Sequence, residues 1–438
     1  MLLNAADKAL WRLALPMIFS NITVPLLGLV DTAVIGHLDS PVYLGGVAVG
    51  ATATSFLFML LLFLRMSTTG LTAQAWGAKD PQRLARELVQ PLALALGAGV
   101  LIILLRLPLI DLALHIVGGS EAVLEQARRF LEIRWLSAPA SLANLVLLGW
   151  LLGVQYARAP VILLVVGNLL NIVLDLWLVM GLRMNVQGAA LATVTAEYAT
   201  LIIGLLMAKR VLTLRGVSLA MLKNAWRGDL RRLLALNRDI MLRSLLLQLC
   251  FGALTVFGAR LGSDIVAVNA VLMTMLTFTA YALDGFAYAV EAHSGQAYGA
   301  RDGSQLLEVW RAACRQSGMV ALAFALIYSL AGQYIIALLT SLPSLQQLAD
   351  RYLIWQTILP VVGVWCYLLD GMFIGATRGA EMRNSMAVAA AGFAVTLLTL
   401  PVLGNHGLWL ALAVFLALRG LSLALIWRRH WRRGTWFS

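Results

Sequence analysis

Apolar runs of about 20 residues or more follow one another along almost the whole chain, separated by short charged or Gly- and Pro-bearing breaks. A helix needs that length to cross a bilayer, because the hydrocarbon core is roughly 30 Å thick and a helix rises about 1.5 Å per residue. Hydrophobic residues make up 61% of the chain, charged residues only 12%, and the mean hydropathy is +0.85. A soluble domain would not carry so apolar a surface. The sequence therefore predicts an all-α integral membrane protein in a lipid bilayer.

The apolar runs predict twelve transmembrane helices and leave little of the chain for a soluble domain. The first run has no small-residue cleavage site before it, so the first helix is expected to stay in the mature protein. The stretch 209–232 is the only break long and polar enough to be a linker. The helices are expected over residues 10–36, 46–76, 86–106, 124–152, 159–180, 187–208, 233–259, 264–294, 311–332, 348–375, 385–403 and 408–428.

Successive breaks between the apolar runs alternate between many and few basic residues. Short cytoplasmic loops of membrane proteins carry an excess of Lys and Arg. If the N-terminus lies inside, most of the 33 lysines and arginines fall on the inner side, with the largest cluster in 209–232. Both termini are therefore expected in the cytoplasm. The formal net charge of +12 builds no continuous basic face, so no nucleic-acid partner is expected.

The chain also repeats itself. The segment AQAWGAKD at 73–80 closes the second helix and GQAYGARD at 295–302 closes the eighth, with five identities in eight positions and a shift of 222 residues (295 against 73). The same shift relates GWLLG to GMFIG, which pairs Gly149 with Gly371 and Gly153 with Gly375. The sequence thus predicts two homologous six-helix lobes.

The predicted lobes cover residues 1–208 and 233–438, joined by the cytoplasmic linker 209–232. An even number of helices leaves both lobes in the same orientation, so they are parallel repeats about an axis along the membrane normal. Transporters use this architecture, with the cavity between the repeats. The alternative is that the repeat reflects only a duplicated scaffold.

Polar residues within the apolar runs are functional candidates, because an ionisable side chain in the bilayer costs several kcal/mol unless it faces a partner or water. In the first lobe these polar residues lie in the first, fifth and sixth helices. Two prolines of the first helix, which each remove a backbone donor and permit a kink, are candidate hinges. The residues are Pro16, Pro25 and Asp31 in the first helix, Asn168, Asn171 and Asp175 on one face of the fifth, and Thr193 and Glu197 one turn apart in the sixth.

Two carboxylates that converge with an amide and a hydroxyl can do one of two things. They can share a proton, since like charges close together are unfavourable, or they can donate oxygen ligands to a small cation. Both chemistries suit the coupling ion of a transporter. The structural alternative is that Asn168, Asn171 and Thr193 hold helices together and that Asp175 pairs with a buried arginine.

A second set of polar and aromatic residues marks a candidate substrate cavity or second site. Arg65 of the second helix needs an acidic partner across the cavity. Aromatic residues suit a promiscuous pocket for apolar cations, although such residues more often pack or face lipid. In the seventh helix Asp239 and Arg243 have the i, i+4 spacing of a structural ion pair. The second-half candidates are Tyr281, Asp284, Phe286, Glu291 and Asp370.

Motifs of other protein classes are not found. None of the lysines follows the glycine that a phosphate-binding loop requires, so ATP-driven pumping is not expected. The three cysteines and five histidines are scattered, so neither a metal site nor a cofactor is expected. No nucleophile constellation points to an enzyme, and no repeated pore-lining motif points to a channel.

Four segments carry a resemblance to a known family: LVDTAVIGHL in the first helix, the duplicated QAxGAxD motif, NVQGAALATVTAE, and LLDGMFIGATRGAEMRNSM. They resemble the MATE family of multidrug and toxic compound extrusion transporters, and within it the DinF branch. The resemblance covers essentially the whole chain. It implies a monomeric antiporter of the bacterial inner membrane with two six-helix lobes that form a V-shaped transporter. It also implies export of amphipathic, often cationic drugs or toxins while protons or sodium ions run inward.

The resemblance assigns an ion-coupling site in the first lobe. Asp31 matches the acidic residue of the family's first helix, Asn171 and Asp175 match the fifth-helix pair, and Thr193 matches a sixth-helix hydroxyl. Asp370 falls where other branches place an acid of the second lobe. The seventh-helix glutamate of those branches has no counterpart here. A lipid-linked oligosaccharide flippase of the same superfamily is the alternative function, but it would need a cavity rich in Arg and Lys.

Overall fold

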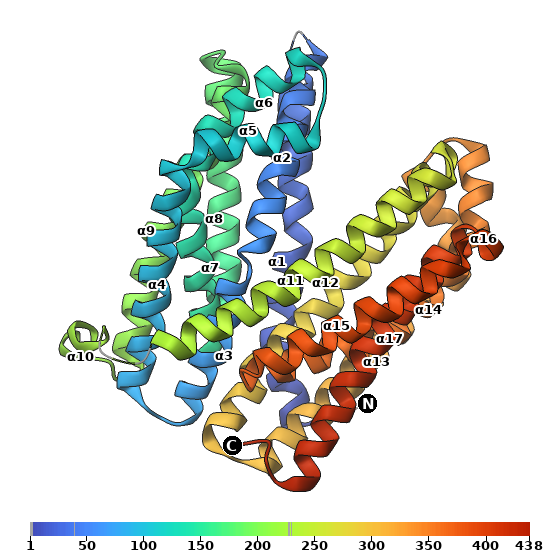
Figure 1. The fold of residues 1–438 in the computed structure, drawn as a ribbon. Helices are drawn as coiled ribbons and strands as arrows, with labels where there is room; N and C mark the ends of the chain where they lie inside the picture. Colours follow the sequence, from blue (N-terminus) through green and yellow to red (C-terminus); the bar gives the residue numbers. More distant parts are fainter. Residues whose placement is uncertain (1–2, 39, 227, 229) are drawn as a thin grey trace. The chain divides into compact units, whose positions relative to one another are not determined.

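The computed structural model describes residues 3–38, 40–226, 228 and 230–438, and of residues 24–32 it describes the backbone only. Within these residues all regular secondary structure is helical (Figure 1). In the part of the chain that the structure describes, eleven helical segments are long and apolar enough to cross a membrane. Many large apolar side chains are exposed, for example Leu330, Leu338 and Val402 at more than four-fifths. Such a surface is stable where lipid replaces water.

The first half follows the six predicted helices, several of which are broken into two elements. The second predicted helix is split at Leu61 and Leu62 and the fourth by a 3₁₀ turn, while the fifth ends in a π-helix. A further short helix follows the third. The elements are α1 (Ala5–Gly36), α2 (Pro41–Leu60), α3 (Phe63–Gly77), α4 (Pro81–Leu104), α5 (Arg106–Val117), α6 (Glu121–Arg134), η1 (Trp135–Ser137), α7 (Ala138–Gly153), α8 (Arg158–Asp175), η2 (Leu176–Gly181) and α9 (Asn185–Leu214).

The second half contains the other six predicted helices, most of them longer than expected. The eleventh is interrupted by a 3₁₀ turn before its last four residues. The elements are α11 (Leu230–Leu261), α12 (Ser263–Ala300), α13 (Gly303–Leu339), α14 (Pro343–Gly375), α15 (Gly379–Thr396), η3 (Leu397–Thr399), α16 (Leu400–Leu403) and α17 (Asn405–Arg433).

The chain divides into two compact units, each with its own apolar core. One unit spans Ile22–Leu233, and the other combines the chain up to Asn21 with Leu234–Ser438. This division differs from the expected lobes, because the first half of α1 packs with the second repeat. Several polar contacts hold it there, including Arg315 Nη2 to Asp7 Oδ1 at 3.0 Å and Trp11 Nε1 to Gln316 Oε1 at 2.9 Å.

The duplicated QAxGAxD motif is a turn between helices, built in the same way twice. Lys79 and Arg301 both adopt the left-handed conformation, with φ of +52° and +53°. The aspartate that follows caps the next helix: Asp80 Oδ1 accepts from the backbone N–H of Arg83, and Asp302 Oδ1 accepts from that of Gln305, both at 3.2 Å. An Asp at this position satisfies an otherwise free helix N–H. The repeat thus preserves a helix stop and the helix start after it.

The paired glycines allow two helices to touch backbone to backbone. A Cβ on Gly149 of α7 would come within 2.6 Å of the Arg65 carbonyl oxygen of α3, and one on Gly371 of α14 within 2.7 Å of the Ala287 oxygen of α12. Arg65 and Ala287 are themselves 222 positions apart. Small residues permit such close helix packing in membranes. Each unit therefore contains the same close contact between its second and fourth predicted helices.

The predicted linker 209–232 is partly helical. The α9 helix continues to Leu214, and the short α10 (Leu219–Asn224) follows before α11 begins. Arg215 ends α9: its guanidinium lies 4.5 Å from the centre of the Trp76 ring and donates to the Val154 carbonyl at 3.2 Å. In the same unit, α10 packs against α4.

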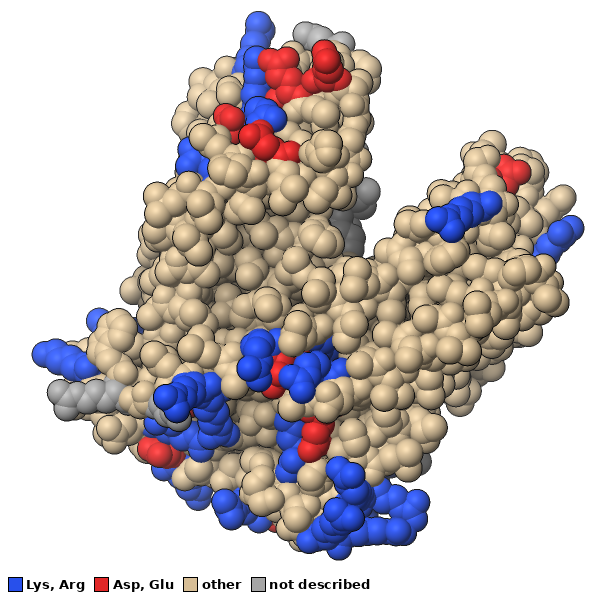
Figure 2. Space-filling model, in the orientation of Figure 1, with Lys and Arg blue, Asp and Glu red and all other residues tan. Residues whose placement is uncertain are grey.

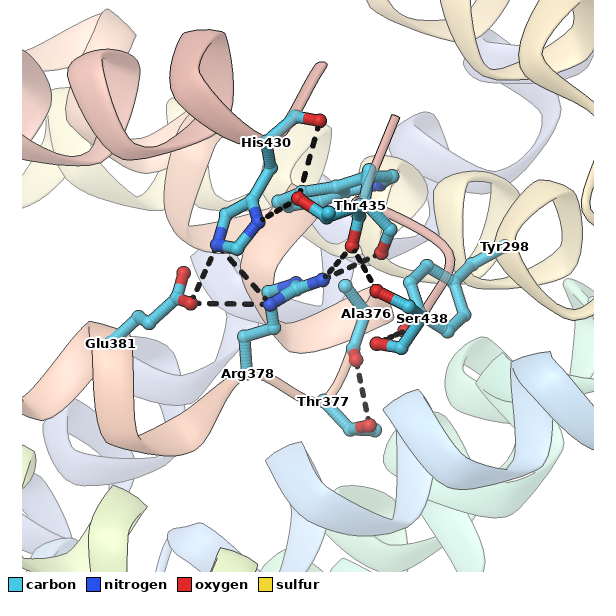
Figure 3. Close-up of polar contacts among 9 residues, drawn as sticks. Tyr298, Ala376, Thr377, Arg378, Glu381, His430, Thr435 and Ser438 are labelled. Atoms are coloured by element: carbon cyan, nitrogen blue, oxygen red, sulfur yellow. Dashed lines mark hydrogen bonds and ion pairs between the residues drawn. The ribbon is translucent and has the colours of Figure 1, made fainter. Parts of the chain in front are cut away.

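The C-terminal segment after α17 folds back onto its own unit (Figure 3). Arg378 donates to the carbonyl oxygens of Thr435 and Trp436 at 2.9 and 2.7 Å and pairs with Glu381 at 3.1 Å. His430 Nε2 lies 2.8 Å from Glu381 Oε1. The Trp436 ring is buried, edge-on to Phe373. This cluster fixes the end of α17 to the turn between α14 and α15.

Candidate functional site

A buried polar centre joins α8 and α9 in the Ile22–Leu233 unit. Asn171 is 3% exposed, and its Nδ2 donates to Thr193 Oγ1 at 3.3 Å. Thr193 in turn donates to the Ala189 carbonyl at 3.2 Å. Asp175 lies one turn beyond Asn171 and is completely buried. The structure therefore brings together the amide and the hydroxyl that the sequence placed on two different helices.

The sequence of α8 explains why these polar groups face inward. Leu169 and Val173 of α8 and Trp177 of the following η2 occupy the opposite side and are each exposed by more than half, as expected for residues that face lipid. Asp175 is the last α-helical residue before the π-helix η2. A π-helix interrupts the regular ladder of backbone hydrogen bonds and often occurs at functional sites. This end of α8 is thus both polar and irregular.

The oxygens of this centre suit a proton or a small cation. The Asn171 Oδ1 atom is buried and has no hydrogen-bond partner among the described residues. It can accept from a protonated carboxyl group or coordinate a cation. No cluster of three or more His, Cys, Asp or Glu side chains suited to a metal ion occurs in the part of the chain that the structure describes.

Asp31 and Pro25 lie outside the residues whose side chains are described, so their side-chain contacts stay predictions. The helix α1 runs without a break from Ala5 to Gly36, past both predicted hinge prolines. Pro16 lies in the part of α1 that packs with the second repeat, and the division between the units falls after Asn21. The chain thus passes from one unit to the other between Pro16 and Pro25.

Two other polar residues of the first half are held by neighbours in their own unit. Arg65 is 3% exposed, and its Nη1 donates to Thr69 Oγ1 at 3.3 Å. The Glu197 carboxylate accepts a hydrogen bond from Asn144 Nδ2 at 3.0 Å. The half-buried Asn168 lies one turn before Asn171 on the same helix. The acidic partner predicted for Arg65 stays a prediction.

Asp370 is held between two arginines in the other unit. Its Oδ2 accepts from Arg243 Nη2 at 2.6 Å and also from Arg419 Nη2. All three residues are at most 7% exposed, and they come from α14, α11 and α17. A carboxylate with two guanidinium partners has little capacity left for a cation ligand.

The predicted ion pair between Asp239 and Arg243 is wrong. Asp239 instead pairs with Arg383 of α15 at 2.6 Å and with Arg238 at 3.4 Å, while Arg243 pairs with Asp370. Spacing on one helix predicts only which side chains can meet, and here each finds a stronger partner on another helix.

The α12 candidates lie along the first half of α1. Phe286 is fully buried, with its ring edge-on to Trp11 at 4.8 Å between centroids. The Tyr281 carbonyl accepts from Asn21 Nδ2 at 3.1 Å. Glu291 is buried and Asp284 half-buried. Phe286 is therefore a packing residue in this structure, whereas the roles of Tyr281, Asp284 and Glu291 stay predictions.

The sequence reasoning missed both arginine partners of Asp370. The spacing on its own helix pairs Arg243 with Asp239, and nothing in the motifs marks Arg419 except that it is an arginine inside an apolar run. The position of Arg419 inside an apolar run is the sequence signal that could have identified it, because a buried guanidinium requires an acid nearby.

Comparisons with known proteins agree on one group. The MatE family profile matches residues 16–177 and 240–403. The chain is 87% identical to the DNA damage-inducible protein F of Escherichia coli K12, across 100% of this chain and 95% of that protein. It is 23% identical to a probable multidrug resistance protein NorM of Acinetobacter baylyi, across 96% and 94%. A solved multidrug resistance MATE transporter in an outward-facing conformation shares the fold, with a TM-score of 0.83 at 23% identity over 98% and 96% of the two chains.

Proposed function

The chain belongs to the MatE family of multi-pass membrane transporters, and on this basis we propose that it is a secondary active antiporter that exports amphipathic, often cationic compounds. Membership confirms the predicted membrane transporter with twelve helices and two lobes, and the expectation that the chain is not an enzyme. We place it in the bacterial inner membrane as a monomer, with both termini cytoplasmic and without a nucleic-acid partner.

The ion-coupling site of this proposal is Asp31, Asn171, Asp175 and Thr193. The observation that carries it is the hydrogen bond from the buried Asn171 to the half-buried Thr193, one turn from the fully buried Asp175. An ionisable residue buried in a spanning helix is costly unless it faces a partner or water, so such residues commonly mark functional sites.

The packing of α1 supports a place for Asp31 in the same site. Val34 and Ile35, one turn beyond Asp31, belong to the same buried cluster as Ala189 and Ala190, one turn before Thr193. Because α1 and α9 are the first and sixth predicted spans, they run in opposite directions through the membrane. Asp31 and Thr193 then lie at a similar depth on neighbouring helices.

We propose a proton as the coupling ion, taken up by the two carboxylates. A proton bound there supplies a donor for an acceptor such as Asn171 Oδ1. Sodium is the alternative, since the four side chains offer enough oxygens for a cation. Asp370 is a poor ligand for either ion, because a cation there would have to displace Arg243 or Arg419.

Transport of a fluorescent cation in everted vesicles tests the proposal. Asp31→Asn and Asp175→Asn should each lower export at least about tenfold at equal membrane abundance, because each removes a titrating group with little change in volume. The matched control is Asp111→Asn, which removes an exposed carboxylate paired with Arg128. Full export by either test variant would contradict the site. Drug flux that requires sodium and leaves the vesicle pH unchanged would contradict the proton.

A further inference from the structure

A polar cavity of about 270 Å³ lies between the start of α4 and the short helix α10. Both helices belong to the Ile22–Leu233 unit. The cavity takes no part in the proposed transport site, which lies on α1, α8 and α9. Its lining is Asp80, Gln82, Arg83, Arg86, Asn224 and Ala225.

Positive charge dominates the surroundings of the cavity. The Arg83 and Arg86 guanidinium groups lie 3.9 and 3.7 Å from the same Glu87 oxygen, so one buried carboxylate partly neutralises both. Asp80 also faces the cavity, but it caps α4 through the Arg83 backbone N–H. Arg232 approaches as well, because its Nη2 donates to the Gln74 oxygen that also accepts from Arg83. Three arginines and two carboxylates therefore give the surroundings of the cavity a net positive charge.

The start of α4 is expected at the level of the membrane headgroups. The helix α4 is a candidate membrane span that begins at Pro81, so Arg83 and Arg86 lie in its first two turns. Figure 2 shows basic side chains near the position that α10 has in Figure 1, with an uncharged surface above them in this view. Anionic headgroups occupy this level of a bilayer.

The residues around α10 point to a lipid and not to a dissolved anion. Leu219, the first residue of α10, is 71% exposed, and Trp226, two residues after the helix ends, is 64% exposed. The Trp226 backbone is tied to α4, since its carbonyl accepts from Gln90 Nε2 at 3.5 Å. Exposed Trp and Leu beside basic residues are typical of a segment that lies in the membrane interface.

We infer that this cavity binds the phosphate of an anionic phospholipid. The Arg83 and Arg86 guanidinium groups contact the phosphate oxygens, and the Asn224 amide donates to the headgroup. Trp226 and Leu219 enter the interface beside the glycerol and acyl chains. The bound lipid then joins α10 to α4 within the unit and holds the linker at the membrane surface.

Native mass spectrometry of the full chain in dodecyl maltoside, titrated with dioleoyl phosphatidylglycerol or dioleoyl phosphatidylcholine, tests this inference. The wild type should bind phosphatidylglycerol at least about fivefold more tightly. Arg83→Gln with Arg86→Gln should weaken phosphatidylglycerol binding about 25-fold, since each basic residue near the surface contributes about fivefold. The matched control is Arg128→Gln with Arg129→Gln, which removes two exposed arginines of α6 and should change binding by less than about twofold.

Asn224→Asp provides a second test that leaves the Arg83–Glu87–Arg86 contacts intact. Asn224 is exposed, so this variant should fold, and the added charge should weaken phosphatidylglycerol binding about fivefold. Equal affinity for the two lipids, or unchanged binding by both test variants, would overturn the inference. Inorganic phosphate that displaces the lipid at millimolar concentration would show a site for a free anion and would also overturn it. None of these outcomes depends on drug export, so the proposed function stands or falls separately.

Discussion

The Asp370 ion-pair cluster offers the sharpest test of what holds the second repeat together. Asp370→Asn keeps the side-chain volume but leaves Arg243 and Arg419, both at most 6% exposed, without a charged partner. Hydrogen bonds to charged groups contribute about 1.5–3 kcal/mol each, and removal of one partner from a buried ion pair costs about 3–5 kcal/mol. The amide oxygen can still accept from one guanidinium. We therefore expect a loss of about 3 kcal/mol in the free energy of unfolding.

Asp239→Asn is the matched control for this prediction. Asp239 also has two arginine partners, but Arg383 is 32% exposed and Arg238 is 62% exposed at the side chain. Solvent screens these pairs, so the expected loss is about 1 kcal/mol. Unfolding of both variants in mixed dodecyl maltoside and dodecyl sulfate micelles, followed by circular dichroism, measures the difference.

A double-mutant cycle shows whether the cost arises from unpaired guanidinium groups. In the Arg243→Met background only Arg419 is left unpaired by Asp370→Asn, so the loss should fall by about half. Equal losses in the two backgrounds, or a loss for Asp370→Asn no larger than that for Asp239→Asn, would refute the reasoning. Asp370 would then be free to act as a cation ligand.

Two further predictions concern the repeated elements of the two units. Gly149→Ala should destabilise the protein by about 1–3 kcal/mol, because its Cβ would meet the Arg65 carbonyl, whereas Gly97→Ala, with open space around it, should have no such cost in the same unfolding assay. Asp80→Ala and Asp302→Ala should each cost about 1 kcal/mol, since each removes the same helix cap. A clearly larger loss for one of them would show that its motif does more than end one helix and begin the next.

Much of the fold was predictable because its signals are local. A spanning helix is recognised by the length and hydropathy of its own residues, so each of the twelve predicted helices corresponds to a helical segment of the structure. The duplicated QAxGAxD motif was recognisable as a repeat. Its role as a helix cap also depends on nearby residues, since Asp80 contacts a residue only three positions away. The periodicity of α8 similarly placed Asn171 and Asp175 on one buried face.

The sequence by itself thus determined the membrane setting, the helices and the two repeats, since these depend on neighbours along the chain. Only the tertiary structure decided which distant groups meet. Asp370 lies 127 residues from Arg243 along the chain, and no spacing rule favours that pair over the wrong i, i+4 pair with Asp239. The packing of the first half of α1 with the second repeat was not predictable from the sequence, for the same reason. Contacts such as the Asp7–Arg315 ion pair depend on how whole helices pack, which the pattern of one helix does not contain.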